Sequence, residues 1–173
     1  AESAAVVTQA GNVLVAFRGR SQGPKTWYNY RSTVSAGGDE AGLRRWTPAR
    51  PLATTPIASA RPKLQSVRLP DGSLRLLLAG GRPSLTLYMS LDGEGERWAP
   101  GVNVAQLHNK HFGNDSKYSF CEPMLRGEQG CPCPEIPSLS CELSGTTGYT
   151  SLVPLHEPGR FLFMYDKLGN GWY

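Results

Sequence analysis

LTLYMSLDGEGERWAP, residues 85–100, is the stretch of sequence that decides the fold. Apolar side chains occupy every second position from Leu85 to Met89, which is the pattern of a half-buried β-strand. Asp92 follows, and its carboxylate can accept hydrogen bonds from backbone N–H groups of its own turn, whose glycines can adopt positive φ. Trp98 supplies a large apolar side chain to fill the space beneath that turn. The stretch therefore predicts a strand, a tight acidic turn and a tryptophan that folds back on the strand.

A strand–turn–strand pattern occurs three times along the chain, at residues 6–18, 66–78 and 151–165. Each copy has two apolar segments separated by a short turn that contains glycine. Asp71-Gly72, in the second copy, is a strong signal for a β-hairpin. The sequence therefore predicts three similar hairpins.

The first two hairpins are each followed by a third strand, a polar glycine-containing turn and a Trp-x-Pro ending, at Trp46 and at Trp98. A unit of about four strands that recurs every 40 to 60 residues is typical of a β-propeller blade. We expect an all-β fold with antiparallel four-stranded blades. A small stand-alone β-sandwich is the alternative. The expected divisions are a blade at 1–50, a blade at 51–108, a cysteine-rich insertion at 109–144 and the start of a further blade at 145–173.

The composition favours short strands and turns over helices, since 20 Gly and 14 Pro accompany only 39% hydrophobic residues in 173. The sequence has no apolar run of about 18 residues, so we expect no membrane span. No targeting segment is recognisable at the N-terminus. The chain starts at Ala1 and ends at Tyr173 within what reads as a structural element, so we expect a fragment of a longer protein.

The net charge of +4 comes from 18 basic and 14 acidic residues, and the basic residues are scattered. Nucleic-acid binding requires a focused basic stripe, so we expect no nucleic-acid partner.

Two connecting segments carry simpler expectations. Residues 51–62 predict a linker that crosses the top of a sheet. Residues 101–116 contain His108 and His111, which we expect in a loop with solvated imidazoles. A metal site is the alternative for this pair, although no second carboxylate or cysteine motif supports one.

All four cysteines lie in one proline-rich segment, at Cys121, Cys131, Cys133 and Cys141. They either form disulfides that staple a long loop or bind a metal, and their spacing does not match common zinc motifs. Cys131 and Cys133 are too close to pair with each other, so we expect Cys121 to pair with one and Cys141 with the other. Disulfides would indicate a secreted or extracellular protein.

The pattern Ser90-x-Asp92-x-x-Gly95-x-x-Trp98 resembles the Asp-box, or BNR repeat, of the sialidase (neuraminidase) superfamily, with one residue more between the aspartate and the tryptophan. In that family the box is a structural turn, repeated in the blades of a six-bladed propeller and remote from the active site. The resemblance implies that this chain is about half of such a propeller and that the rest is needed to complete the ring.

The segment around Tyr149, TTGYTSL, is similar to the Tyr-Ser-Ser-Leu type segment of sialidases, whose tyrosine is the nucleophile. The resemblance implies that Tyr149 is catalytic; a structural tyrosine is the alternative. A neutral phenol avoids repulsion by the substrate carboxylate next to the anomeric carbon. Glu122 and Glu142 are available as its base, although neither is at a matching position.

Sialidases hold the substrate carboxylate with three arginines, because a guanidinium can bind a carboxylate through two parallel hydrogen bonds. This chain departs from the pattern, since Leu85 stands where the family has its second arginine. Arg82, Arg126 and Arg61 are the candidate substitutes, each with an alternative reading as a surface or turn arginine.

The leading functional hypothesis is a glycoside hydrolase of the exo-sialidase type that cleaves terminal acidic sugars from glycans without a cofactor or metal. The second is a non-catalytic propeller that binds glycan or protein. The third is a glycosidase or lyase for another acidic sugar.

Overall fold

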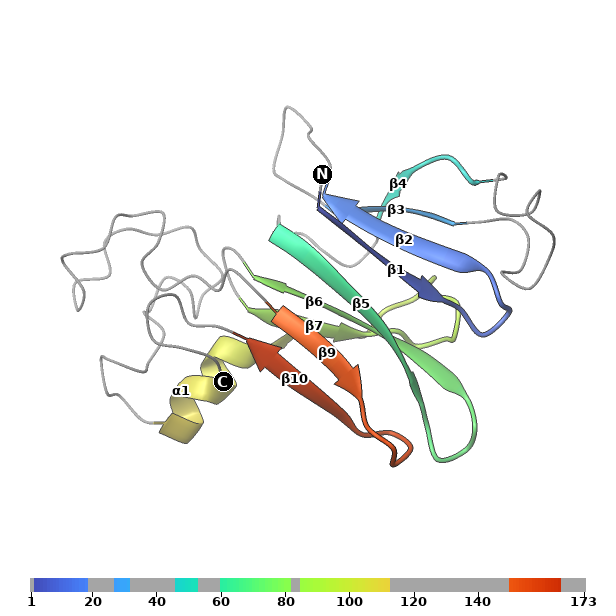
Figure 1. Ribbon diagram of the computed structural model, residues 1–173. Helices are drawn as coiled ribbons and strands as arrows, with labels where there is room; N and C mark the ends of the chain where they lie inside the picture. The colour runs from blue at the N-terminus through green and yellow to red at the C-terminus, as the bar shows by residue number, and fades with distance from the viewer. Residues whose placement is uncertain are drawn as a thin grey trace.

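The computed structural model describes residues 2–18, 27–31, 46–52, 60–81, 85–112 and 150–165 (Figure 1). These residues form ten β-strands and one short α-helix. All paired strands are antiparallel, which confirms the predicted all-β class.

The strands form three sheets in which neighbours in sequence are neighbours in space. The first sheet consists of β1 (Ser3–Val7), β2 (Val13–Arg18), β3 (Trp27–Arg31) and β4 (Arg50–Pro51). The second consists of β5 (Ala60–Arg68), β6 (Leu74–Gly81), β7 (Thr86–Met89) and β8 (Val102–Asn103). The third consists of β9 (Thr150–Pro154) and β10 (Phe161–Tyr165). The helix α1 (Val104–Phe112) follows β8 directly.

All three predicted hairpins are present, as β1–β2, β5–β6 and β9–β10. A glycine with φ of 80–83° occurs in each turn: Gly11, Gly72 and Gly159. In the first two turns this glycine donates its N–H to the residue three before it, at 3.0 Å to the Thr8 carbonyl and 2.9 Å to the Leu69 carbonyl. A tight turn followed by a left-handed glycine matches the right-handed twist of paired strands. The shared geometry explains why the three segments have similar sequences.

The predicted linker at 51–62 is wrong at both ends. Pro51 belongs to β4, the outermost strand of the first sheet, where it pairs with Tyr28 of β3. Pro62 lies within β5. Proline has no N–H to donate, so it is tolerated on an edge strand and at an irregularity. The pairing of β5 with β6 shifts register between Ala60 and Lys63, which is where Pro62 lies.

The second sheet is buried on both faces, between the first and third sheets (Figure 1). On one face, Leu76 and Leu78 of β6 pack with Leu14 of β2. On the other, Leu77 packs with Leu152 of β9. Since successive strand residues point to opposite faces, burial on both explains the continuous apolar run in β6.

The first strands of the three sheets lie side by side and run in the same direction, with β5 in contact with both β1 and β9 (Figure 1). They are not hydrogen-bonded to one another, because each sheet pairs only with its own strands. The sheets therefore pack face to face, and their first strands β1, β5 and β9 are adjacent in that order.

The helix α1 overturns the expectation of a loop at 101–116. Its N-terminus is capped by Asn103, whose side-chain oxygen accepts the N–H of Gln106 at 3.2 Å. Val104 and Ala105 are buried against Leu85. His108 lies on the same face of the helix and is only 2% exposed, whereas His111 is exposed as expected. Among the described residues, no helix is long and apolar enough to cross a membrane.

Candidate functional site

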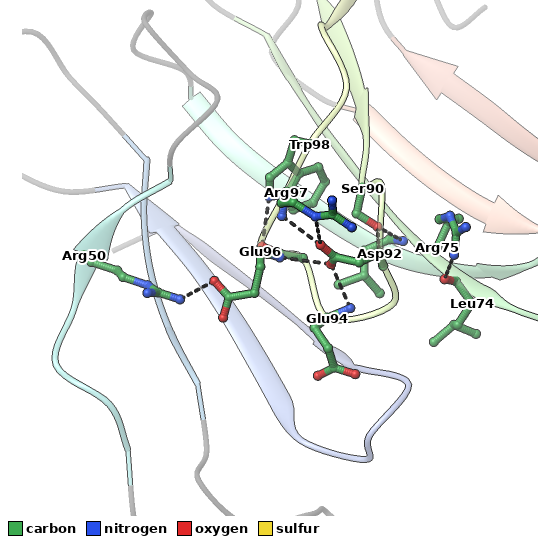
Figure 2. A network of polar contacts seen from close by, with 11 residues as sticks. Arg50, Leu74, Arg75, Ser90, Asp92, Glu94, Glu96, Arg97 and Trp98 are labelled. Atoms are coloured by element: carbon green, nitrogen blue, oxygen red, sulfur yellow. Dashed lines mark hydrogen bonds and ion pairs between the residues drawn. The ribbon is translucent and has the colours of Figure 1, made fainter.

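Figure 2 shows the network of polar contacts around the turn from Ser90 to Trp98. Ser90 starts it and is completely buried. Its Oγ accepts the backbone N–H of Leu76 at 2.7 Å and donates to the carbonyl of Asp92 at 2.5 Å. Ser90 also donates its own N–H to the Leu76 carbonyl at 2.8 Å. The serine therefore attaches the turn to β6, where a larger side chain would not fit.

The carboxylate of Asp92 organises the turn by accepting three backbone N–H groups (Figure 2). Oδ1 accepts from Glu94 and Glu96, both at 3.1 Å, and Oδ2 accepts from Arg97 at 3.0 Å. Burial raises the pKa of Asp92, but the three N–H groups and the Arg97 guanidinium together outweigh it and lower the pKa below its usual value. The carboxylate is therefore held ionised as a structural acceptor.

Trp98 closes the turn from below, as the sequence predicts. Its Nε1 donates to the carbonyl of Gly95 at 3.0 Å, and its ring is buried in the core between the first and second sheets. Gly95 has a φ of 70°, and a Cβ there would lie 2.9 Å from Leu14 and 3.0 Å from Leu76. Only glycine satisfies both the backbone conformation and the space.

The turn also holds the first sheet against the second. Gln9, in the β1–β2 turn, donates its N–H to the Gly93 carbonyl at 3.0 Å, and Ala10 donates to Oε1 of Glu94 at 2.7 Å. On the other side, Arg50 of β4 forms an ion pair with Glu96 at 2.6 Å (Figure 2). The Ser90–Trp98 turn is thus a clamp between two sheets, and its polar groups are directed at the protein itself.

The three hairpin turns lie at one end of the sheets, and the first residues of β1, β5 and β9 lie at the other end (Figure 1). The hairpin turns lie together, because Leu74 donates its N–H to Oε1 of Gln9 at 3.1 Å and Gly159 donates to the Arg68 carbonyl at 2.6 Å. The strands β1, β5 and β9 run in the same direction, so their starts share the other end (Figure 1). We call it the strand-start end.

Among the predicted site residues, Arg61 is in β5 at the strand-start end. Gly81 and Thr150, the described residues next in sequence to Arg82 and Tyr149, also lie there, since Gly81 pairs with Ala60 and Thr150 begins β9. The remaining predicted residues lie outside the described ranges: Arg82, Arg126, Tyr149, Glu122, Glu142, Cys121, Cys131, Cys133 and Cys141.

A buried polar pair at this end escaped the sequence analysis. Nδ1 of His108 is 2.8 Å from the hydroxyl of Tyr165, and the two rings meet edge to face. Tyr165 is directly opposite Thr150 in the β9–β10 pairing. A helical face of Val104, Ala105 and His108 was the available signal, but the segment is too short to show clear periodicity.

The hydrogen bond between His108 and Tyr165 can run in either direction, since an imidazole and a phenol can each donate and accept. Thr150 adds a buried hydroxyl that has no hydrogen-bond partner among the described residues. Within the same residues, no group of three or more His, Cys, Asp or Glu side chains is placed to hold a metal ion.

Neither a scan against models of known protein families nor a search of curated proteins found a match to this chain.

Proposed function

We propose that the three sheets are consecutive blades of a sialidase-like six-bladed propeller and that the protein is a glycoside hydrolase of the exo-sialidase type. The supporting observation is the Ser90–Trp98 clamp between sheets whose first strands lie side by side in the same direction. In a propeller, the first strands of all blades surround the central channel. The proposal therefore requires further sheets to complete the ring.

The reaction assigned to Tyr149 is attack of its phenolate oxygen on the anomeric carbon of a terminal acidic sugar. The glycosidic C–O bond breaks, a general acid protonates the leaving oxygen, and water later hydrolyses the sugar–tyrosine bond. A neutral phenol that loses its proton to a nearby base approaches the anionic sugar without charge repulsion. Thr150, which follows Tyr149 in the sequence, is buried at the start of β9, and this supports a site at that end of the sheet.

The substrate in this proposal is a glycan with a carboxylate on its terminal sugar. Arg61, Arg82 and Arg126 are proposed to bind that carboxylate, since a guanidinium matches a planar anion with two hydrogen bonds. Arg61 is in β5, and Gly81, which precedes Arg82, pairs with the first residue of that strand. The position of Arg61 in β5, at the same end as Thr150, is the observation that supports this assignment.

One observation favours the alternative, a non-catalytic propeller that binds glycan or protein. Leu85 is at the position where the family pattern has an arginine, and its side chain is completely buried against Val104, Ala105 and Tyr165. A buried leucine covered by a helix cannot bind a carboxylate. The binding function therefore fits a chain that keeps the scaffold and lacks the full arginine set.

A fluorogenic sialoside assay distinguishes the two functions. We expect the protein to release the fluorophore and Tyr149→Phe to abolish release, because phenylalanine has no nucleophilic oxygen. Tyr88→Phe is the matched control, since it removes a half-buried phenol hydroxyl from the second sheet. Undiminished activity in Tyr149→Phe would refute the mechanism. No activity in the folded wild type, with retained glycan binding, would support the alternative, and release from a fluorogenic uronide alone would indicate another acidic sugar.

We further propose that the protein is secreted and that Cys121, Cys131, Cys133 and Cys141 form two disulfides. Each would stabilise the fold by roughly 2–3 kcal/mol by restricting the unfolded chain. Intact-mass measurement after alkylation without reductant tests the proposal. Four alkylated thiols in the native protein would rule out the disulfides and remove this argument for secretion.

A further inference from the structure

The two end sheets each present an apolar face that no described sheet covers. On the third sheet, Val153 and Leu162 are directly opposite in register and are 40% and 47% exposed. Leu155 follows on the same side of the chain and is also exposed. On the first sheet, Val7 is 49% exposed and Ala5 is exposed on the same side of β1. Residues of this kind on adjoining positions indicate a contact surface.

We call the exposed side of the third sheet the trailing face, which comprises Ser151, Val153, Leu155, Leu162 and Met164. We call the exposed side of the first sheet the leading face, which comprises Ala5, Val7 and Val15. Strand alternation separates each face from the one that packs on the second sheet, where β1 contributes Ala4 and Val6.

The trailing face is equivalent to a face that is buried elsewhere in the same chain. When the hairpins are aligned on their turns, Val153 is one residue before the end of β9, as Val67 is one residue before the end of β5. Val67 pairs with Arg75 and Val153 pairs with Leu162. Val67 is buried against the third sheet. The trailing face therefore has the position from which a sheet contacts the next sheet.

The leading face is equivalent to the face of the second sheet that packs on the first sheet. Val15 is the third residue of β2, and Leu76 is the third residue of β6. Leu76 is completely buried against the first sheet. Val15 pairs with Ala5 as Leu76 pairs with Ser66. The leading face therefore has the position from which a sheet contacts the preceding sheet, and the two end faces are the two halves of an interface that the chain already forms twice.

We propose that the trailing face of one copy of this chain binds the leading face of a second copy, head to tail. The contact repeats the packing of the second sheet on the third, with apolar side chains on both sides and burial of apolar area as the driving force. Such a contact is heterologous, so it closes a ring or extends along a line. Taking only the number of six sheets from the proposed function, two copies of three sheets would close one ring.

Sedimentation velocity over a range of concentrations of the 173-residue chain tests the contact. We expect the wild type to form a dimer or a longer head-to-tail assembly. Leu162→Arg on the trailing face and Val7→Arg on the leading face are each expected to weaken self-association at least about tenfold, because each buries an unpaired charge. Leu107→Arg is the matched control, since Leu107 is 54% exposed on α1 and belongs to neither face, so its change should leave association intact.

Mixing the two variants provides the decisive measurement. A head-to-tail contact requires one intact trailing face and one intact leading face. Leu162→Arg mixed with Val7→Arg should therefore form a one-to-one complex at concentrations at which neither variant associates by itself. A wild type that stays monomeric would overturn the proposal, as would a mixture that fails to associate. Association that is lost in Leu162→Arg and unchanged in Val7→Arg would show a face-to-face dimer instead. Circular dichroism verifies folding, and Val153→Lys replaces Leu162→Arg if that variant does not fold. The test is independent of the proposed reaction, because sedimentation reports assembly and not hydrolysis: a chain that cleaves no sialoside can still associate, and a monomeric chain can still cleave one.

Discussion

Replacing Asp92 with alanine is the most direct test of how the first two sheets are held together. The substitution leaves the N–H groups of Glu94, Glu96 and Arg97 without their common acceptor. A turn that loses this acceptor also loses the positions of Gly93 and Glu94, which contact the first sheet. We therefore expect a loss of global stability that exceeds the effect of an ordinary turn mutation.

The size of the loss follows from the surroundings of the three hydrogen bonds. The bond from Glu94 is partly buried and the bonds from Glu96 and Arg97 are exposed, so water can replace the acceptor only at the latter two. A hydrogen bond to a charged group contributes about 1.5–3 kcal/mol, and we assign about 2 kcal/mol to the partly buried bond and about 0.5 kcal/mol to each exposed bond. The free energy of unfolding should therefore fall by about 3 kcal/mol.

Urea denaturation followed by circular dichroism measures this change as a lower midpoint at unchanged slope. Asp71→Ala is the matched control, because the Asp71 carboxylate accepts the N–H and hydroxyl of Ser73 at 2.9 and 2.6 Å in an exposed hairpin turn. We expect a much smaller loss there, since that turn is solvated. Equal losses in Asp92→Ala and Asp71→Ala would refute the clamp.

The same carboxylate predicts a dependence of stability on pH. The pKa of Asp92 is lower in the folded protein than the value of about 3.9 in an unfolded chain. Its contribution to stability is therefore fully present above about pH 4 and is lost as the pH falls through the folded pKa. When the pH is lowered from 5, the free energy of unfolding should fall less in Asp92→Asn than in the wild type, because asparagine does not titrate. Parallel curves for the two proteins would contradict this origin of the lowered pKa.

The remaining predictions concern one glycine and one histidine. Gly93→Ala should lower the thermal midpoint, because its Cβ would lie 2.6 Å from Cβ of Gln9. The same change should lower the midpoint much less in a Gln9→Gly background, in which that Cβ is absent, and an equal loss in both backgrounds would contradict the steric cause. His108→Leu should cost about 1–3 kcal/mol in urea denaturation, because it leaves the buried hydroxyl of Tyr165 without this partner, whereas His111→Leu on the exposed side should cost little. Equal effects of the two histidine changes would exclude a role for the buried pair.

Local patterns were sufficient to predict the hairpins and the turn from Ser90 to Trp98, but not the contacts by which that turn holds the first sheet. The turn chemistry around Gly72, and the succession of Ser90, Asp92 and Trp98, depend on neighbours within about ten residues. Such contacts are determined by short-range backbone geometry, so they appear in the sequence as fixed spacings. The all-β class followed from the same patterns.

Contacts between distant segments were not predictable in this way. His108 lies on the helix face on which Val104 and Ala105 pack against Leu85, and its buried ring contacts the hydroxyl of Tyr165, 57 residues later. No local pattern encodes that meeting, which is why the sequence indicated a solvated loop.

By itself, the sequence determined the strands, their tight turns and the tryptophan that returns beneath the Asp92 carboxylate, because each depends on backbone conformations and side chains that are close in the chain. The tertiary structure alone decided which face of each strand is buried, that β6 packs on both sides, and that the end sheets keep one apolar face each. A face is buried when another sheet packs on it. Which sheets pack together depends on the apolar area summed over whole faces, and no spacing of a few residues in the sequence determines that sum.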